Sequence, residues 1–152
     1  RVFSFIKKNC LNKIPKSTNL SDQDNKLINN LKDNIPKLIK LMNNQNLNEY
    51  IKIVVSFSFN ANKYFNDSEP WALKEKDPLR MQTILFTISE QIKNISILLN
   101  PIIPEATTKI LDIMNIDKEN ISISSINKLE FINHDKELKK LEILFKKIDN
   151  DN

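Results

Sequence analysis

The chain of 152 residues contains no glycine, and this absence limits its possible folds more than any other single feature. Tight hairpin turns of the primed types and the loops that surround phosphate groups depend on glycine, which reaches the backbone conformations they need without steric cost. Glycine-rich nucleotide-binding motifs are therefore excluded from this sequence. Of its six prolines, Pro15 lies in a predicted loop, and the other five lie where they can start or interrupt helices.

Apolar residues recur at spacings of three and four through most of the chain, which is the period of an α-helix. We expect helices over residues 2–6, 22–41, 47–66, 78–99 and 104–114. A chain of this length fits one domain with a sizeable core. The pattern predicts an all-α fold, an antiparallel helical bundle that forms a single domain over residues 1–152.

Start and stop signals support these helices. Ser21 is expected to cap the second helix, with Asp24 as the acidic partner three residues later. Asp77 and Pro78 mark the start of the fourth helix as cap and first helical residue. Pro36 lies inside the second helical pattern and has no N–H to donate, so it predicts a kink or a break there.

The predicted helix over 47–66 carries a wide apolar stripe, because Ile53, Val55 and Phe59 extend its apolar face. We therefore expect this helix to be the most buried of the bundle. Just after it, Ser68 or Asp67 is expected to cap a short helical segment whose first turn contains Pro70 and Trp71, the only tryptophan.

The C-terminal part of the chain follows a different pattern. Residues 121–132, "ISISSINKLEFI", alternate and are β-branched, which is typical of a short strand or of an extended tail. No partner strand is evident elsewhere in the sequence. Residues 135–148 form a charged stretch that begins at a capping residue and contains the apolar pair Leu144 and Phe145. We expect this part to be a short appendage on the helical bundle.

The net charge of +4 is a weak indication of an anionic partner, because lysine, asparagine and isoleucine are also the residues that an A/T-rich genome favours. The sequence has one cysteine, Cys10, and neither a secretion signal nor a segment of about 20 apolar residues. We expect a soluble, cytoplasmic protein without a membrane partner.

Residues that could form a catalytic or metal centre are scarce. His134 is the only histidine, and no cysteine lies near it in the sequence. A Ser-His-Asp arrangement or a metal cluster would therefore need unrelated segments to converge. We interpret His134 as an exposed loop residue and predict neither catalytic residues nor metal ligands in this chain.

Trp71 is flanked by polar and charged residues, in "NDSEPWALKEKD" at 66–77, and two interpretations of it are open. The ring can plug the end of the bundle and anchor the 66–78 connection against the helix before it. Alternatively, it can project from the start of the short helix and offer a flat face on which an unpaired nucleic-acid base stacks. Pattern reasoning does not separate the two.

Three features of the sequence, in order, resemble the anticodon-binding domain of methionyl-tRNA synthetases. They are the Asn-x-Tyr of "NKY" at 62–64 ahead of the Pro-Trp pair, a lysine shortly after that pair, and the Leu-x-Pro-x-x-Pro joint in "LNPIIP" at 99–104. The resemblance covers most of residues 1–148. Related synthetases for leucine, isoleucine, valine and cysteine also carry helical bundles, but the Pro-Trp pair favours the methionine enzyme. Near the end, Lys146 and Lys147 replace a proline and an arginine of the family pattern.

The resemblance implies an anticodon site. In the family, an Asn-Leu-x-x-Arg motif and the tryptophan of Pro-Trp read the CAU anticodon. Arg1 matches the arginine of that motif, whose asparagine would precede residue 1, so the domain is expected to be truncated at its N-terminus. Trp71 would be the stacking platform, and Asn66 and Pro70 are further candidates for the same RNA-binding pocket.

The resemblance also implies what the chain lacks. The family's catalytic, nucleotide-binding domain, with its His-Ile-Gly-His-like and Lys-Met-Ser-Lys-Ser-like motifs, is absent from these residues. We expect no cofactor here, and ATP, with zinc in many members, in the missing catalytic part of a methionine-tRNA ligase. The expected partners are the anticodon loop of tRNA(Met), not DNA, and the catalytic domain of the same chain.

Two other hypotheses come from different classes. A helical scaffold could bind protein partners through the region of Phe57 and Phe65, with Trp71 as a packing plug. An independent small enzyme has little support, because no acid–base pair or nucleophile assembly can be named.

Overall fold

A computed structural model describes residues 1–17, 19–127, 132–141 and 143–145, and these residues form helices, turns and irregular segments without a strand. The elements are α1 (Val2–Asn9), α2 (Asp22–Asp33), α3 (Ile35–Asn43), α4 (Leu47–Ser68), α5 (Pro70–Leu73), α6 (Pro78–Leu99), α7 (Pro104–Ile113) and the 3-10 turns η1 (Lys118–Asn120) and η2 (Ile123–Asn127). The predicted all-α fold is confirmed. No helix in the described ranges combines the length and the apolar character that a membrane crossing needs.

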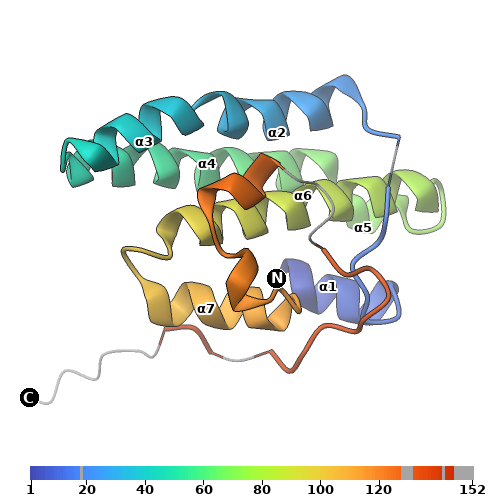
Figure 1. Ribbon diagram of the computed structural model, residues 1–152. Helices are drawn as coiled ribbons and strands as arrows, with labels where there is room; N and C mark the ends of the chain where they lie inside the picture. The colour runs from blue at the N-terminus through green and yellow to red at the C-terminus, as the bar shows by residue number, and fades with distance from the viewer. Residues whose placement is uncertain (18, 128–131, 142, 146–152) are drawn as a thin grey trace, which may run out of the picture.

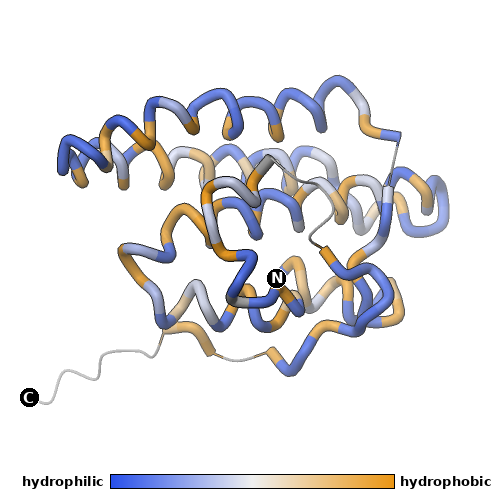
Figure 2. Tube along the Cα trace, in the orientation of Figure 1, coloured by the Kyte–Doolittle hydropathy of each residue, from blue (hydrophilic) through white to orange (hydrophobic). Residues whose placement is uncertain are grey.

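The helices form layers around α6 (Figure 1). In that view α2 and α3 follow one another above α4, α6 lies in the middle, and α7 and α1 lie below it. The long helices α4 and α6 run antiparallel and are joined through α5, and α6 turns back into α7 at the Pro101 and Pro104 joint. Figure 2 shows that α2, in the outer layer, is mostly hydrophilic, as expected of a helix that buries only one stripe.

The most buried helix is α6, and the prediction that the helix over 47–66 would be the most buried is wrong. On α4, Phe59 is 71% exposed and Val55 is also exposed. On α6, most side chains are buried, including polar ones such as Glu90, Lys93 and Asn94. The reason is that α6 contacts helices on several sides, namely α1, α2, α4, α5 and α7, while one side of α4 faces solvent. Burial therefore follows the number of neighbouring elements, which an apolar count along one helix does not give.

The predicted helix boundaries are largely confirmed. The second helical pattern breaks at Asn34, immediately before α3, whose second residue is Pro36. Asp77 caps α6, because its carboxylate accepts a hydrogen bond from the backbone N–H of Arg80 at 3.0 Å. Ser21 and Asp24 form a reciprocal capping box at the start of α2.

The capping box allows a prediction about stability. Ser21→Ala is expected to lower the free energy of unfolding by about 1 kcal/mol, because the backbone N–H of Asp24 loses its acceptor at the helix start. Urea unfolding measures this change. Ser4→Ala, at an exposed position within α1, is the matched control and should leave the free energy of unfolding unchanged within about 0.5 kcal/mol. Equal losses in the two variants would contradict the capping role.

The C-terminal appendage packs on the bundle without forming a strand in its described part. Residues 123–127 are a 3-10 turn, so the strand interpretation of that stretch is wrong. The backbone N–H of Leu138 donates to the carbonyl of Asn12 at 2.7 Å, and that of Lys139 donates to the carbonyl of Ile113 at 3.0 Å. The appendage therefore joins the loop after α1 to the end of α7. The replacements at Lys146 and Lys147 lie outside the described residues.

His134 belongs to this packing, and its interpretation as an exposed residue is wrong. The ring is half-buried, its Nδ1 lies 2.9 Å from the carbonyl oxygen of Ile14, and its centroid lies 5.7 Å from that of Phe86. These contacts give the histidine a structural role. No group of three or more metal-ligating side chains occurs within the described residues.

Candidate nucleic-acid interface

The connection between α4 and α6 positions Trp71. Glu69 ends α4 with φ 42° and ψ 55°, a left-handed conformation that is uncommon for a residue other than glycine. Pro70 then starts α5, where its fixed φ suits the first helical position. The predicted cap by Asp67 or Ser68 is wrong, because Glu69 occupies the cap position and no side chain caps α5. The hydroxyl of Ser68 is buried without a hydrogen-bond partner.

The indole of Trp71 is both anchored and exposed. Its ring is 46% exposed, and it meets the ring of Phe65 edge-on, with centroids 5.9 Å apart and planes at 75°. Phe65 is only 3% exposed and belongs to the core. The plug interpretation is correct in that Trp71 packs against α4, but the exposed part of the ring leaves room for a stacking partner.

The guanidinium of Arg1 lies beside the two rings. Its Cζ is 4.9 Å from the Phe65 ring centroid and 5.8 Å from the Trp71 ring centroid, within the range of cation–π attraction. Its Nη2 donates a hydrogen bond to Oδ1 of Asn66. An arginine has five N–H donors in a planar fork, so this bond orients the guanidinium while other donors stay available.

The structure thus brings together the residues that the sequence predicted for one pocket, although they come from three elements. Arg1 precedes α1, Asn66 is in the last turn of α4, and Pro70 and Trp71 start α5. Pro70 is buried, and its fixed φ restricts the backbone directly before Trp71. Sequence reasoning missed Phe65, the ring that supports both Arg1 and Trp71, since it looked like any other core residue of the apolar stripe.

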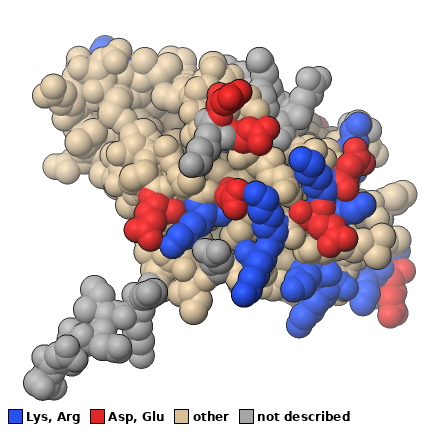
Figure 3. All heavy atoms as spheres, turned by 60° about the horizontal axis from the view of Figure 1, so that its bottom comes forward, with Lys and Arg blue, Asp and Glu red and all other residues tan. Residues whose placement is uncertain are grey.

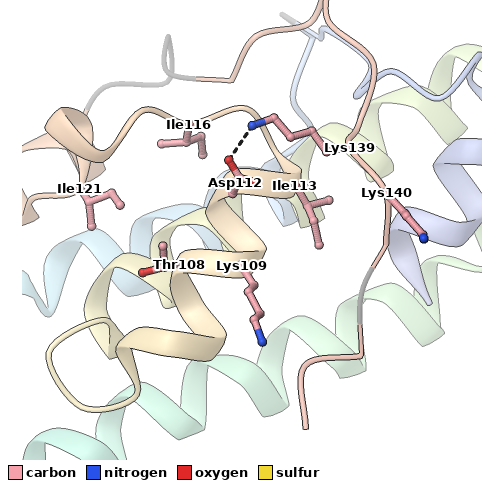
Figure 4. Close-up of a pocket in the computed structure, with 8 residues that line it drawn as sticks. All are labelled: Thr108, Lys109, Asp112, Ile113, Ile116, Ile121, Lys139 and Lys140. Atoms are coloured by element: carbon pink, nitrogen blue, oxygen red, sulfur yellow. Dashed lines mark hydrogen bonds and ion pairs between the residues drawn. The ribbon is translucent and has the colours of Figure 1, made fainter.

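Away from these residues, a hollow lies between α7 and the C-terminal appendage. It has a volume of about 500 Å³ and is lined by Thr108, Lys109, Asp112, Ile113, Ile116, Ile121, Lys139 and Lys140 (Figure 4). Lys139 pairs with Asp112 at 2.6 Å, and Lys109 pairs with Glu105 at 3.1 Å. Figure 3 shows lysines and carboxylates interleaved on this face of the molecule. Carboxylates so close to the lysines weaken any attraction for phosphate. The better candidate for an RNA interface is therefore the group of Arg1, Phe65, Asn66 and Trp71, called the Trp71 cluster below.

Solved structures similar to this chain include methionyl-tRNA synthetases. The free form of the enzyme from Mycobacterium tuberculosis matches 96% of this chain and 30% of its own chain with a TM-score of 0.88, at 21% sequence identity. A structure of that enzyme with methionyl-adenylate matches with a TM-score of 0.89 at 22% identity, over 97% of this chain and 29% of its own. These likenesses show that the chain has the same fold as part of that enzyme.

Sequence comparison identifies the family. A family model described as the anticodon binding domain of methionyl tRNA ligase matches residues 14–152, and the chain belongs to this family. The methionine–tRNA ligase of Brucella suis is 33% identical over 114 residues, which are 75% of this chain and 22% of that protein. The ligase of Pyrococcus abyssi is 26% identical over 153 residues, which are 99% of this chain and 20% of that protein. The chain therefore spans about a fifth of the length of these relatives.

Proposed function

We propose that this chain recognises the CAU anticodon of tRNA(Met) for a methionine-tRNA ligase. The observation that carries the proposal is the Arg1 guanidinium, which is hydrogen-bonded to Asn66 and lies beside the half-exposed Trp71. Membership of the anticodon-binding family supports it.

The geometry suits the reading of an unpaired base. The exposed face of the indole offers stacking for a base. The guanidinium beside it can donate to the acceptors on a base edge, and cytosine carries two acceptors, O2 and N3, on its pairing edge. Because Oδ1 of Asn66 accepts from Arg1, the amide N–H₂ of Asn66 is left to donate as well. Stacking and donor pattern together would select the base.

The wider activity belongs to the parent enzyme and is part of the same proposal. That enzyme would use ATP to attach methionine to tRNA(Met) in the cytoplasm. ATP, and possible zinc, would be bound by a catalytic domain elsewhere in its chain. The present residues would hold the anticodon so that the acceptor end reaches that domain. We expect them to form no methionyl-adenylate on their own, because they contain neither the His-Ile-Gly-His-like nor the Lys-Met-Ser-Lys-Ser-like motif of the family's catalytic domain.

Titration with anticodon stem-loops tests the proposal. The single tryptophan of the chain reports binding directly, because a base stacked on Trp71 changes its fluorescence. A CAU loop is expected to bind more tightly than loops with one changed anticodon base, by about 1 to 3 kcal/mol per changed base. Equal affinity for CAU and for the changed loops would reject anticodon recognition.

A protein-binding scaffold at Phe57 and Phe65 is not supported. Both rings are buried in the bundle core, so neither can form a docking surface. This hypothesis, which the sequence left open, is therefore wrong in the form predicted.

A further inference from the structure

A buried carboxylate joins three helices close to the Trp71 cluster. Asp24 of α2 accepts a hydrogen bond from the hydroxyl of Tyr64 on α4 at 2.6 Å. It also accepts two from the guanidinium of Arg80 on α6, at 2.5 and 3.0 Å, and one from the backbone N–H of Ser21 at 2.9 Å. Burial alone would raise the pKa of the Asp24 carboxyl, but these hydrogen bonds outweigh it and hold the pKa below its ordinary value. Asp24, Tyr64 and Arg80 are called the Asp24 network below.

The Asp24 network fixes both ends of the segment that carries the indole. Tyr64 directly precedes Phe65, whose ring supports Trp71. On the other side, Arg80 lies in the first turn of α6, and its backbone N–H is the group that Asp77 caps. The residues from 69 to 77 therefore run between two helix ends that the same carboxylate holds against α2.

The segment itself has little to fix its direction. A helix of four residues, α5, is too short to be stable alone, and no side chain caps it. Glu69 holds a left-handed conformation, and such a conformation persists only where the surrounding structure imposes it. The orientation of the indole therefore comes from the packing of α5 on α6 and of the Trp71 ring on Phe65 of α4.

We propose that Asp24, Tyr64 and Arg80 are positioning residues that hold the ring of Trp71 in the orientation in which it takes an anticodon base. They act through α4 and α6 and need not touch RNA. This inference rests on the proposed function. It identifies the residues of the bundle that set the orientation of the Trp71 ring. A purely structural role would predict loss of stability without a change at the ring.

Two conservative variants separate these roles. Tyr64→Phe removes only the hydroxyl, and Arg80→Lys keeps the charge but loses the paired hydrogen bonds of the fork. Tyr50→Phe is the matched control, because Tyr50 is also a buried tyrosine on α4 whose hydroxyl donates to α6, at the carbonyl of Leu98, but it lies outside the Asp24 network. Two measurements are made on the 152-residue chain: quenching of Trp71 fluorescence without RNA, and the dissociation constant for the CAU stem-loop. Circular dichroism confirms that each variant is folded.

Tyr64→Phe and Arg80→Lys are expected to change the quenching of Trp71 and to weaken binding of the CAU loop by about 3- to 10-fold. This loss is smaller than the loss of one whole stacking interaction, because the ring is still present. Tyr50→Phe is expected to leave both measurements unchanged. Unchanged quenching and affinity in the two network variants, with the CAU preference of the unmodified chain intact, would overturn the positioning role alone. Equal changes in Tyr50→Phe would also overturn it. Absence of a CAU preference in the unmodified chain would reject the proposed function and this inference with it.

Discussion

Trp71→Ala in the parent enzyme is expected to lower the rate constant kcat/KM for charging tRNA(Met) by about 5- to 150-fold, which corresponds to about 1 to 3 kcal/mol for one stacked base. The ring is half-exposed and lies beside the Arg1 guanidinium, so its loss removes the stacking face and one of the two aromatic contacts of that guanidinium. Formation of methionyl-adenylate should not change. Aminoacylation of tRNA measures the first effect, and methionine-dependent pyrophosphate exchange measures the second.

Phe59→Ala is the matched control for this prediction. Phe59 is also an exposed aromatic residue on α4, but the Arg1 guanidinium lies over the rings of Phe65 and Trp71 and pairs with Asn66. Charging by the Phe59 variant should stay close to that of the unmodified enzyme. If Trp71→Ala lowered adenylate formation as much as charging, or if both variants lost charging equally, the role of the indole in anticodon recognition would be refuted.

The helix caps and the helix break could be predicted from the sequence, because each depends on residues that are close together in the chain. The capping box of Ser21 and Asp24 and the cap at Asp77 depend on residues at most three positions apart. The break before Pro36 needs only the missing N–H of one residue. Each of these features can be inferred from neighbouring residues, without knowledge of contacts between distant segments.

The unpredicted features depend on contacts between distant segments. Glu69 adopts a left-handed conformation without being glycine, and the surrounding chain imposes it. The greater burial of α6 than of α4 arises from helices that surround it. His134 is held by a carbonyl 120 positions away in the sequence. No pattern within a short window contains this information.

The candidate site falls between these two cases. Hydrophobic patterning did not decide whether the indole is a packing plug or a stacking platform. The site residues Arg1, Asn66 and Trp71 could be named only from the resemblance to a family. The structure adds Phe65, which contacts both Arg1 and Trp71 and explains how the ring can be anchored and exposed together. Its role could not be seen in the sequence, where it is one apolar residue in a long stripe.

Lys93→Met is expected to cause the largest loss of stability, about 3 to 5 kcal/mol in the free energy of unfolding at about pH 7. Lys93 and Glu90 are both fully buried on α6, and Nζ of Lys93 donates to Oε2 of Glu90 at 2.7 Å. Methionine fills a similar volume but leaves the buried carboxylate of Glu90 without this cation. The other carboxylate oxygen, Oε1, already has no hydrogen-bond partner. Urea unfolding measures the loss.

Lys109→Met is the matched control, because Lys109 also pairs with a carboxylate one helical turn away, Glu105, but on the surface. Its loss should cost about 1 kcal/mol or less, since exposed ion pairs are screened by water.

The pH dependence of the stability of Lys93→Met gives a second test. Burial raises the pKa of Glu90 above its ordinary value, and removal of Lys93 raises that pKa further. The folded variant then binds the Glu90 proton more tightly than the unfolded chain does, so its stability rises as the pH falls through the raised pKa. The difference between Lys93→Met and the unmodified chain should therefore be smaller at about pH 5 than at about pH 7. A loss no greater than that of the surface control, or one that grows toward acid pH, would show that the buried carboxylate does not depend on Lys93.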